Sequence, residues 1–470
     1  MRRFATFACA AALYGCAAVG PDYERPRLDL PAHYPGTEAA GAPGETLRSD
    51  WWALYRDPVL DRLVAAAFQR NADLKIAVAR IEETDANLRE AGAALFPEID
   101  VGATANRSRI SANTATPVPS GVPLLRNDFR LTFSTSFELD FWGKLRRAQE
   151  AARALALASR YGRDTVALSL AGLVTQTYFA LRSLDAQIAV SRRSLATREE
   201  TLATVRERLA GGIASDLDLA QAQSARADAA TQVRDLLRQR ALLEHQLAAL
   251  TGQLDLALPA GKRAGLPVPP VPPAGLPSTL LARRPDVRQA EEQLVAANAE
   301  IGVARAQQLP ALSLTGYLGA ESAALSDLLS SSSGIFLLGL GLAQPVIDAG
   351  RYQARTEAAV ARQQQAREAY RKSVETAFRE VADALVSLRQ STESEVDYDA
   401  RRDAARRALA AARTRYESGY SAYLEVLDAQ RTLNDAELAY LRNRQTRLTA
   451  SVDLMKALGG GWKDVTPVAQ

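Results

Sequence analysis

Four short stretches of the chain alternate between apolar and polar residues, the pattern of a β-strand with two unlike faces. The clearest is 128–141, where the odd positions are apolar apart from Thr135 and the even positions are polar or charged. Similar alternation marks 99–106, 312–315 and 336–343. Each strand is predicted to run about ten residues, the length that a tilted strand needs to cross a bilayer.

These four strands cannot close a barrel, and open sheet edges are not tolerated in lipid. A soluble sandwich would alternate similarly, but four strands are few for 470 residues. If the strands enter a membrane, the chain must oligomerise, and two copies would give eight strands and three would give twelve. The polar loops Arg107–Asn127 and Glu321–Gly334 are then expected to face outside.

A second pattern, with small apolar residues at three- and four-residue spacing, predicts long helices that pack as coiled coils do. It covers 144–209 and 351–418, each about 100 Å long at the α-helical rise and too polar for lipid. A helix of roughly 23 residues precedes each hairpin (71–94, 286–308), and one of about 35 follows each long helix (215–250, 422–458). The two shorter helices could stack end to end beside the long one. A soluble coiled-coil scaffold would also explain the helices.

The same order of elements occurs twice, which indicates an internal duplication. Gly143 and Gly350, Gly212 and Gly419, and Gln223 and Gln430 are each 207 positions apart. Seven prolines between 258 and 277 predict an extended linker between the halves. The predicted divisions are a signal peptide (1–15), a lipidated N-terminal and equatorial segment (16–60), a first repeat (61–252, hairpin about 98–141), a Pro-rich linker (253–285), a second repeat (286–459, hairpin about 311–346) and a tail (460–470).

The amino terminus has the features of a secretory signal. Arg2 and Arg3 precede the apolar run 4–13, which is too short to span a bilayer. Leu13-Tyr14-Gly15-Cys16 resembles a bacterial lipobox, in which the cysteine is acylated and becomes the first mature residue. Acyl chains would anchor Cys16 stably. Ala17, in place of the Asp that retains many lipoproteins at the inner membrane, favours the outer membrane.

Composition argues against several other functions. The net charge of +3 falls to +1 without Arg2 and Arg3, which gives no support for nucleic-acid binding. Only two cysteines and two histidines occur, and both cysteines lie within the first sixteen residues. Disulfides, thiol nucleophiles and metal sites therefore have few candidates. We expect no enzyme activity and no cofactor, apart from the covalent lipid on Cys16.

Several motifs, in this order and spacing, resemble the OprM/NodT-type outer-membrane efflux lipoproteins of the TolC superfamily. The resemblance covers nearly the whole chain, from residue 13 to about 459. Its motifs are Val19-Gly-Pro-Asp-Tyr23, Trp51-Trp52, Phe96-Pro97, Phe137–Lys144, Arg283–Val287, Gln344–Arg351 and Arg415–Gln430.

The resemblance implies an α+β membrane protein that forms a homotrimer. A twelve-stranded β-barrel, with four strands per chain, would cross the outer membrane of a Gram-negative bacterium and continue into a periplasmic α-helical barrel. It also implies a periplasmic adaptor (a membrane fusion protein) and an inner-membrane pump, often of the RND class, as partners. Trp51, Trp52 and Trp142 are expected to be packing or interfacial residues.

Two groups of site residues come from the same resemblance. Gly211, Gly212 and Gly419 are expected at the helix-to-helix turns away from the membrane, where the family contacts its adaptor; a purely conformational role for glycine is the alternative. Leu424 and Asp428 match positions that close the periplasmic end as inward rings. The alternative for Asp428 is a surface ion pair with Arg431. Leu217 and Gln221, the matching first-repeat residues, lack the acid.

The function expected from these features is the passive export of drugs and other small toxic compounds as the outer-membrane channel of a tripartite efflux pump. A type I protein-secretion duct shares the fold, but its members usually lack the lipid. A periplasmic structural lipoprotein without a pore is the alternative of another class. The sequence names no substrate, adaptor or pump.

Overall fold

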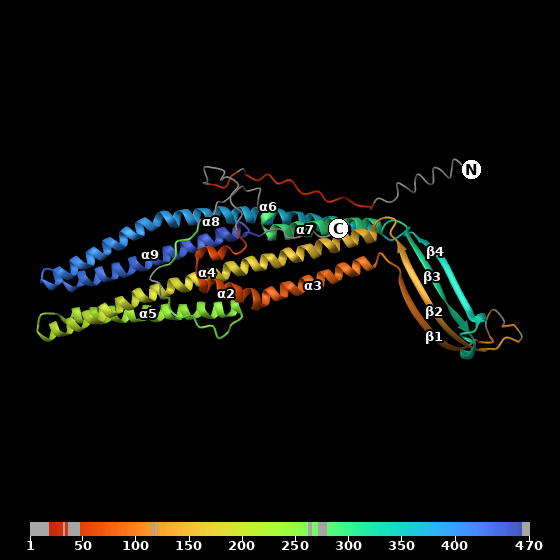
Figure 1. The fold of residues 1–470 in the computed structure, drawn as a ribbon, viewed down its shortest axis with the longest axis horizontal. Helices are drawn as coiled ribbons and strands as arrows, with labels where there is room; N and C mark the ends of the chain where they lie inside the picture. Colours follow the sequence, from red (N-terminus) through yellow and green to blue (C-terminus); the bar gives the residue numbers. More distant parts are fainter. Residues whose placement is uncertain are drawn as a thin grey trace. The chain divides into compact units, whose positions relative to one another are not determined.

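The computed structural model describes residues 18–31, 33–35, 48–113, 115, 118–119, 121–261, 266–270 and 280–462. The lipobox residue Cys16, the signal segment and much of the Pro-rich linker lie outside the described residues. Six helices and four strands of the two predicted repeats, together with shorter helices, make up the described chain (Figure 1).

Two helices of equal length dominate the chain, α4 (Lys144–Ala210) and α8 (Arg351–Glu417), each of 67 residues. The prediction of two very long helices is confirmed within two residues at each end. The other helices are η1 (Trp51–Tyr55), α2 (Pro58–Arg70), α3 (Ala72–Ala93), α5 (Asp216–Thr251), α6 (Leu280–Arg283), α7 (Pro285–Ala306), η3 (Leu325–Asp327), η4 (Ser331–Ser333) and α9 (Tyr423–Ala457).

The four strands form one antiparallel sheet in the order β1-β2-β3-β4. Their bounds are β1 (Glu98–Arg109), β2 (Leu125–Leu139), β3 (Ala311–Ser322) and β4 (Gly334–Ala343). The register places Val101 opposite Phe133 and Phe133 opposite Leu318, so the apolar positions of neighbouring strands share one face. The predicted alternation is confirmed, and the β2–β3 pairing joins the two repeats in one sheet.

The predicted loops were too long. The ladder between β1 and β2 continues to the pair Arg109 and Leu125, although the residues there are mostly polar. β2 also ends at Leu139, two residues before the predicted end at Phe141. Alternation identifies a strand by its two faces, whereas backbone hydrogen bonds extend a ladder regardless of polarity.

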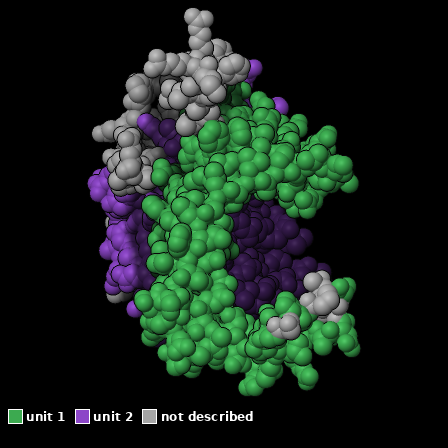
Figure 2. Space-filling view, turned by 90° about the vertical axis from the view of Figure 1, so that its right-hand side faces the viewer, with its two compact units in different colours: residues 1–27, 80–159, 290–370 green, residues 28–79, 160–289, 371–470 purple. Residues whose placement is uncertain are grey.

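Contacts divide the chain into two compact units, coloured separately in Figure 2. Unit 1 comprises residues 1–27, 80–159 and 290–370, and unit 2 comprises 28–79, 160–289 and 371–470. Each unit therefore takes residues from both predicted repeats. The division into repeats and segments proposed above remains a prediction.

In unit 1 the N-terminal segment 18–27 is fixed to the helices by polar contacts. Asp22 accepts from the buried Arg147 guanidinium at 2.6 Å, and Arg25 forms a bidentate pair with Glu291 at 2.5 and 2.9 Å. The backbone of Gly20 lies so close to Gly302 that an added Cβ would be 2.6 Å from its Cα. Glycine at both positions permits this approach.

The main apolar core lies in unit 2, where η1 and α2 pack with α4, α5 and α9. Trp51 is fully buried there, Trp52 meets it edge to face at 5.8 Å, and Tyr178 and Phe179 fill the α4 side. The packing role expected for Trp51 and Trp52 is confirmed. Within the described residues, no helix combines the length and the apolarity needed to cross a membrane.

Candidate functional site

The sheet of unit 1 has an apolar face that none of the described residues covers. Phe336, Leu338, Leu340 and Leu342 on β4 are each at least 67% exposed, and Val101 on β1 is 63% exposed. The other face carries polar residues such as Thr132, Ser134 and Thr315. Burying exposed apolar side chains stabilises a protein by roughly 1.5–3 kcal/mol each, so this face requires a lipid or protein environment.

Both outer edges of the same sheet are open. β1 pairs only with β2 and β4 only with β3, so each outer strand presents an unpaired row of backbone groups. β1 and β4 run in opposite directions because the sheet is an antiparallel meander of four strands. The free edge of β4 in one copy can therefore pair antiparallel with β1 of another copy.

The helix hairpins of unit 2 end in turns of the same construction. Ile213 N–H donates to Arg208 O and Gly212 N–H to Leu209 O; Tyr420 N–H donates to Arg415 O and Gly419 N–H to Tyr416 O. This is the Schellman motif, which needs a residue of positive φ. The φ angles of Gly212 and Gly419 are 73° and 77°. Gly211 precedes the first motif and keeps a φ outside the left-handed region.

No atom lies within 4 Å of a Cβ added to Gly212 or Gly419, so both turns face open space. The residues after them, Ile213 and Tyr420, are each 80% exposed. A conformational reason for the two glycines is therefore present, as the alternative interpretation supposed. The adaptor role of Gly211, Gly212 and Gly419 stays a prediction.

The predicted gate residues lie at the start of α9. Leu424 is 56% exposed, and the Asp428 carboxylate accepts from Arg431 at 2.9 Å. The ion pair that the alternative interpretation expected is thus present in the single chain. Both partners are largely exposed, and such pairs contribute little to stability. Pairing with Arg431 does not prevent Asp428 from facing other copies, and its gate role stays a prediction.

One apolar cluster holds the two hairpins together near their turns. Leu202 and Val205 of α4 pack there with Tyr423 and Val426 of α9. Polar contacts add to it, since Gln430 donates to Thr201 at 3.3 Å. The start of α9 is therefore fixed by its buried side while Leu424 and Asp428 face away.

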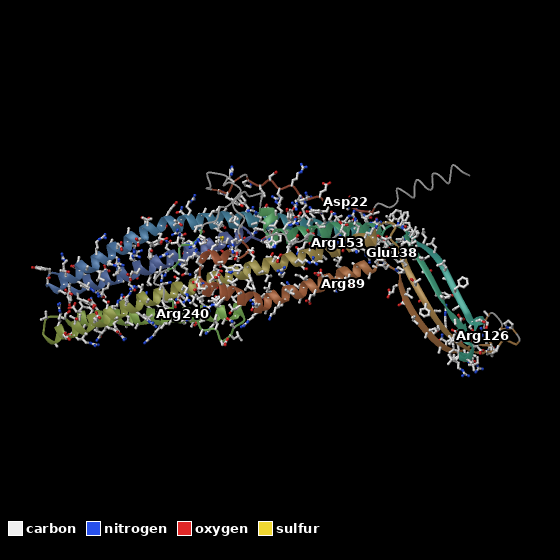
Figure 3. All side chains as sticks on the ribbon, viewed as in Figure 1. Asp22, Arg89, Arg126, Glu138, Arg153 and Arg240 are labelled. Carbon is white, nitrogen blue, oxygen red and sulfur yellow. The ribbon has the colours of Figure 1, made fainter. Side chains whose placement is uncertain are left out.

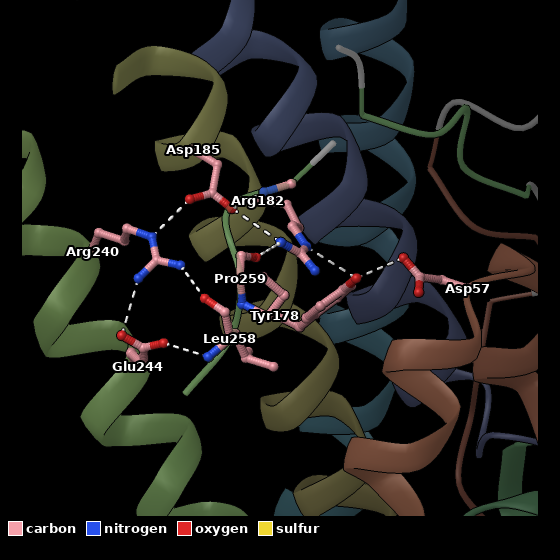
Figure 4. A network of polar contacts seen from close by, with 9 residues as sticks. Asp57, Tyr178, Arg182, Asp185, Arg240, Glu244, Leu258 and Pro259 are labelled. Carbon is pink, nitrogen blue, oxygen red and sulfur yellow. Dashed lines mark hydrogen bonds and ion pairs between the residues drawn. The ribbon is translucent and has the colours of Figure 1, made fainter. Parts of the chain in front are cut away.

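A polar network that the sequence did not reveal lies further along the same helices (Figure 4). Arg240 of α5 contacts Asp185 of α4 at 2.7 Å, and Asp185 also accepts from Arg182 at 3.1 Å. Side chains of α5 also bind the chain segment that follows this helix. Glu244 accepts a hydrogen bond from Leu258 N–H, and Arg240 donates one to the Leu258 carbonyl. The network fixes the first part of the linker against both helices.

The network extends to the start of α2. Tyr178 donates to Asp57 at 2.7 Å and accepts from Arg182 at 3.1 Å. Burial, together with the neighbouring Asp57 carboxylate, raises the pKa of the Tyr178 phenol to about 12. Asp57 also accepts from Val59 N–H and so caps α2. The residues that Asp57 contacts are far from it in the sequence. Only the helix-start signal Asp57-Pro58 could have indicated a role for Asp57 from the sequence.

A cavity of about 1010 Å³ adjoins this network within unit 2. Its wall includes Tyr178, Arg182, Arg402, Arg406 and Tyr440. Several of these guanidiniums are already bound, since Arg182 pairs with Asp185 and Arg406 with Asp403. Within the described residues no group of His, Cys, Asp and Glu side chains is placed to hold a metal ion.

Trp142, at the helix end of β2, donates its indole N–H to Pro310 O at 2.8 Å and meets Phe141 edge to face. It therefore packs against the junction of strand and helix. Its expected place at the lipid interface stays a prediction, and the lipidation site Cys16 lies outside the described residues.

An exposed apolar sheet with open edges, joined to long polar helices, defines a class: a channel-forming protein of an outer membrane. The chain matches the family model described as "Outer membrane efflux protein" at residues 63–253 and 276–460. It belongs to this family, and it is an outer-membrane efflux channel component of the TolC superfamily, as its motifs indicated.

Individual relatives agree. The chain is 34% identical over 469 residues to the solvent efflux pump outer membrane protein SrpC of Pseudomonas putida, with 96% of each protein covered. It is 33% identical over 465 residues to the cation efflux system protein CusC of Escherichia coli, with 97% of this chain and 98% of CusC covered. The solved Campylobacter jejuni CmeC outer membrane channel matches with a TM-score of 0.88 at 25% identity, with 96% of each chain covered.

Proposed function

We propose that three copies of this chain form the outer-membrane duct of a tripartite efflux pump, which exports drugs and other small toxic compounds. Twelve strands, four from each copy, would close a barrel in the membrane, and the long helices would continue it into the periplasm. The observation that carries this proposal is the four-stranded sheet with an exposed apolar face and two open, antiparallel edges.

Strand number favours three copies over two. An eight-stranded barrel has an interior just wide enough for its own side chains, whereas larger barrels leave room for a channel or ligand. The polar face of this sheet also carries small residues, including Gly339 and Gly341 on β4. A barrel of twelve strands with these small residues inside would have an open passage, whereas the interior of an eight-stranded barrel would be filled by side chains.

The remaining parts of the proposal follow the family resemblance. Acyl chains on Cys16 would anchor each copy in the outer membrane, the turns at Gly211, Gly212 and Gly419 would meet a periplasmic adaptor, and the inner-membrane pump would be of the RND class. Leu424 and Asp428, with Arg431 beside the acid, would narrow the periplasmic end. The duct would transport passively, without catalysis or a cofactor.

The relatives do not give the substrate. SrpC belongs to a solvent efflux pump and CusC to a cation efflux system, at nearly the same identity to this chain. Selectivity is therefore assigned to the pump. The second candidate function is a protein-secretion duct, which shares the fold. The third is a structural lipoprotein without a pore.

Cysteine cross-linking tests the trimer directly, because Cys9 and Cys16 are the only natural cysteines. Val101→Cys on β1 is combined in turn with Leu338→Cys, Leu340→Cys and Leu342→Cys on β4. A disulfide needs Cα atoms about 4.4–6.8 Å apart, so the partner in register should link copies. We expect a ladder that stops at three chains on non-reducing gels.

The control joins Val101→Cys to Phe133→Cys, which are opposite each other within one chain. It should give no ladder. A wild-type protein without single-channel current in planar bilayers, or a ladder that stops at two chains, would overturn the proposal. Current together with a three-chain ladder excludes the structural lipoprotein.

A further inference from the structure

The apolar face of the sheet carries two charged residues, and both are arginines on β1. This face consists of the odd positions of β1 and β2 and the even positions of β3 and β4, as the register fixes. Across all four strands, every residue of which is described, the charged residues on this face are Arg107 and Arg109. Carboxylates occur only on the opposite face, for example Asp128 and Glu138.

Both arginines lie at the end of the sheet that bears the β1–β2 loop, away from the helices. In Figure 3 the label Arg126 on β2 marks the loop end of the sheet, and the label Glu138 marks the helix end of the same strand. Below the arginines the face is uncharged from Ala105 down to Ile99. The helix end of the face has no charge, and the residues there are apolar and exposed, such as Ile99 on β1 and Leu342 on β4.

The spacing matches a membrane. Ile99 and Arg107 are eight residues apart, about 26 Å along a strand at roughly 3.3 Å per residue. With the usual barrel tilt of about 40°, this corresponds to about 20 Å of height, close to the roughly 25 Å apolar band of outer-membrane barrels. Because the helices are assigned to the periplasm, the guanidinium groups of Arg107 and Arg109 lie at the headgroup level of the outer leaflet.

Partners differ between the two faces. On the polar face, Arg130 lies 4.7 Å from the Tyr317 ring centroid and 3.8 Å from Glu321, and Arg126 donates to Pro123 O. The Arg107 and Arg109 side chains are exposed, and neither guanidinium has a hydrogen-bond or ion-pair partner among the described residues. Two adjacent, unneutralised guanidiniums at the rim of a lipid-facing surface suit an anionic headgroup.

We propose that Arg107 and Arg109 bind the phosphate groups of a phosphorylated glycolipid of the lipid A type in the outer leaflet. The proposal rests on the proposed function, since it needs the sheet in the outer membrane with its loops outside. Guanidinium groups bind phosphate oxygens through two parallel N–H···O bonds, which favours arginine over lysine at such a site. The acyl chains would then lie along the apolar face, on Ala103 and Val101.

Binding is measured by native mass spectrometry of the purified full-length protein in neutral detergent. Bis-phosphorylated lipid A is titrated against lipid A from which both phosphates have been removed. Phosphatidylglycerol and inorganic phosphate are added as competitors in separate arms. The variant is R107Q/R109Q, and the matched control is R89Q/R126Q, which removes the same charge from α3 and from the polar face.

The wild type should bind the phosphorylated lipid much more tightly than the dephosphorylated one. R107Q/R109Q should weaken that binding about thirtyfold, because each arginine near an anionic lipid surface contributes a factor of about five. R107K/R109K should lose less, and R89Q/R126Q should bind as the wild type does. Millimolar inorganic phosphate and phosphatidylglycerol should compete weakly.

Equal binding of the two lipids by the wild type would overturn the inference without any variant. Unchanged binding by R107Q/R109Q would also overturn it. Full competition by inorganic phosphate would assign the pair to free phosphate. Planar-bilayer current from the same samples separates these results from failure of the duct itself, in which case no current is seen.

Discussion

Asn71 and Arg284 stand directly before α3 and α7, the two helices of 22 residues, yet they join their helices to the chain by different chemistry. The Asn71 amide accepts from Asp73 N–H and donates to Leu250 O at 3.1 Å, so the start of α3 is fixed to the end of α5. Arg284 donates to Ala457 O at 3.1 Å, so the start of α7 meets the end of α9. The two junctions are therefore alike in place but are made by different side chains.

The helix turns show the same relation. Both have a Schellman motif with glycine at the left-handed position, but only α5 begins with a capping box, in which Ser215 and Asp218 bond each other's backbone. The N-cap of α9 is Ala422, which has no capping side chain. Backbone geometry is therefore shared between the repeats, while the side-chain stabilisation of each turn differs.

Removal of Arg284 should cost more than removal of Asn71. The Arg284 side chain is buried and pairs with Asp286 at 2.7 Å and Glu380 at 2.8 Å. Arg284→Ala should lower the free energy of unfolding by about 2–3 kcal/mol, less than for a fully buried pair because both acids are partly exposed. Asn71→Ala should cost about 1 kcal/mol. Denaturant unfolding followed by circular dichroism compares them, and equal losses would contradict the difference inferred between the junctions.

Bulky residues at the turns should strain the backbone but leave the fold intact. A Cβ added at Gly212 or Gly419 meets open space, so the main cost of Gly212→Trp and Gly419→Trp is the left-handed conformation, about 1–2 kcal/mol. If the turns contact an adaptor, both variants should form trimers yet lose efflux, measured as drug susceptibility of cells. Gly121→Trp is the control, because it places the same residue at a positive φ in the β1–β2 loop. Loss of trimers at the turns would favour a purely folding role for the glycines.

Exchanging the caps should make the two turns more alike. Ser215→Ala removes a capping box and should cost about 1 kcal/mol, mostly as fraying at the start of α5. Ala422→Ser places serine three residues before Glu425 and should add a capping box worth up to about 1 kcal/mol. Hydrogen exchange of the first-turn amides reports both changes. No gain in protection from Ala422→Ser would show that contacts other than the cap limit the second turn.

The sequence predicted repeating patterns well and single contacts poorly. The strands and the long helices were predictable because each alternation or helical stripe extends over many residues, and the two halves repeat the same order. The network of Asp185, Arg240 and Glu244 was not, since charged residues on a long polar helix look alike until packing brings two of them together. α2 was missed for the opposite reason, as its thirteen residues merge with the patterns around it.

The strand ends show the same limit on a smaller scale. Arg107 was assigned to a polar loop, yet Arg107 and Arg109 lie in β1, on the same face as its apolar residues. The apolar alternation of β1 stops at Ala105, whereas its hydrogen-bonded ladder with β2 continues to Arg109. For the gate, the sequence supplied both interpretations of Asp428, and the single chain shows the one that needs no second copy, the pair with Arg431.

Asp428→Ala therefore separates the two interpretations with almost no change in stability. The exposed pair with Arg431 contributes little to folding, so denaturant unfolding should match the wild type within error. In a trimer, three carboxylates would meet at one level, where repulsion has to be relieved by cations or by raised pKa values. Their removal should increase ion leakage in planar bilayers and antibiotic entry into cells. Gln221→Ala, the matching position in the first repeat, is the control and should leave the current unchanged. If the Asp428→Ala and Gln221→Ala variants both give the wild-type current, Asp428 is a surface residue without a gate role. The two matching positions then differ in residue type but not in function.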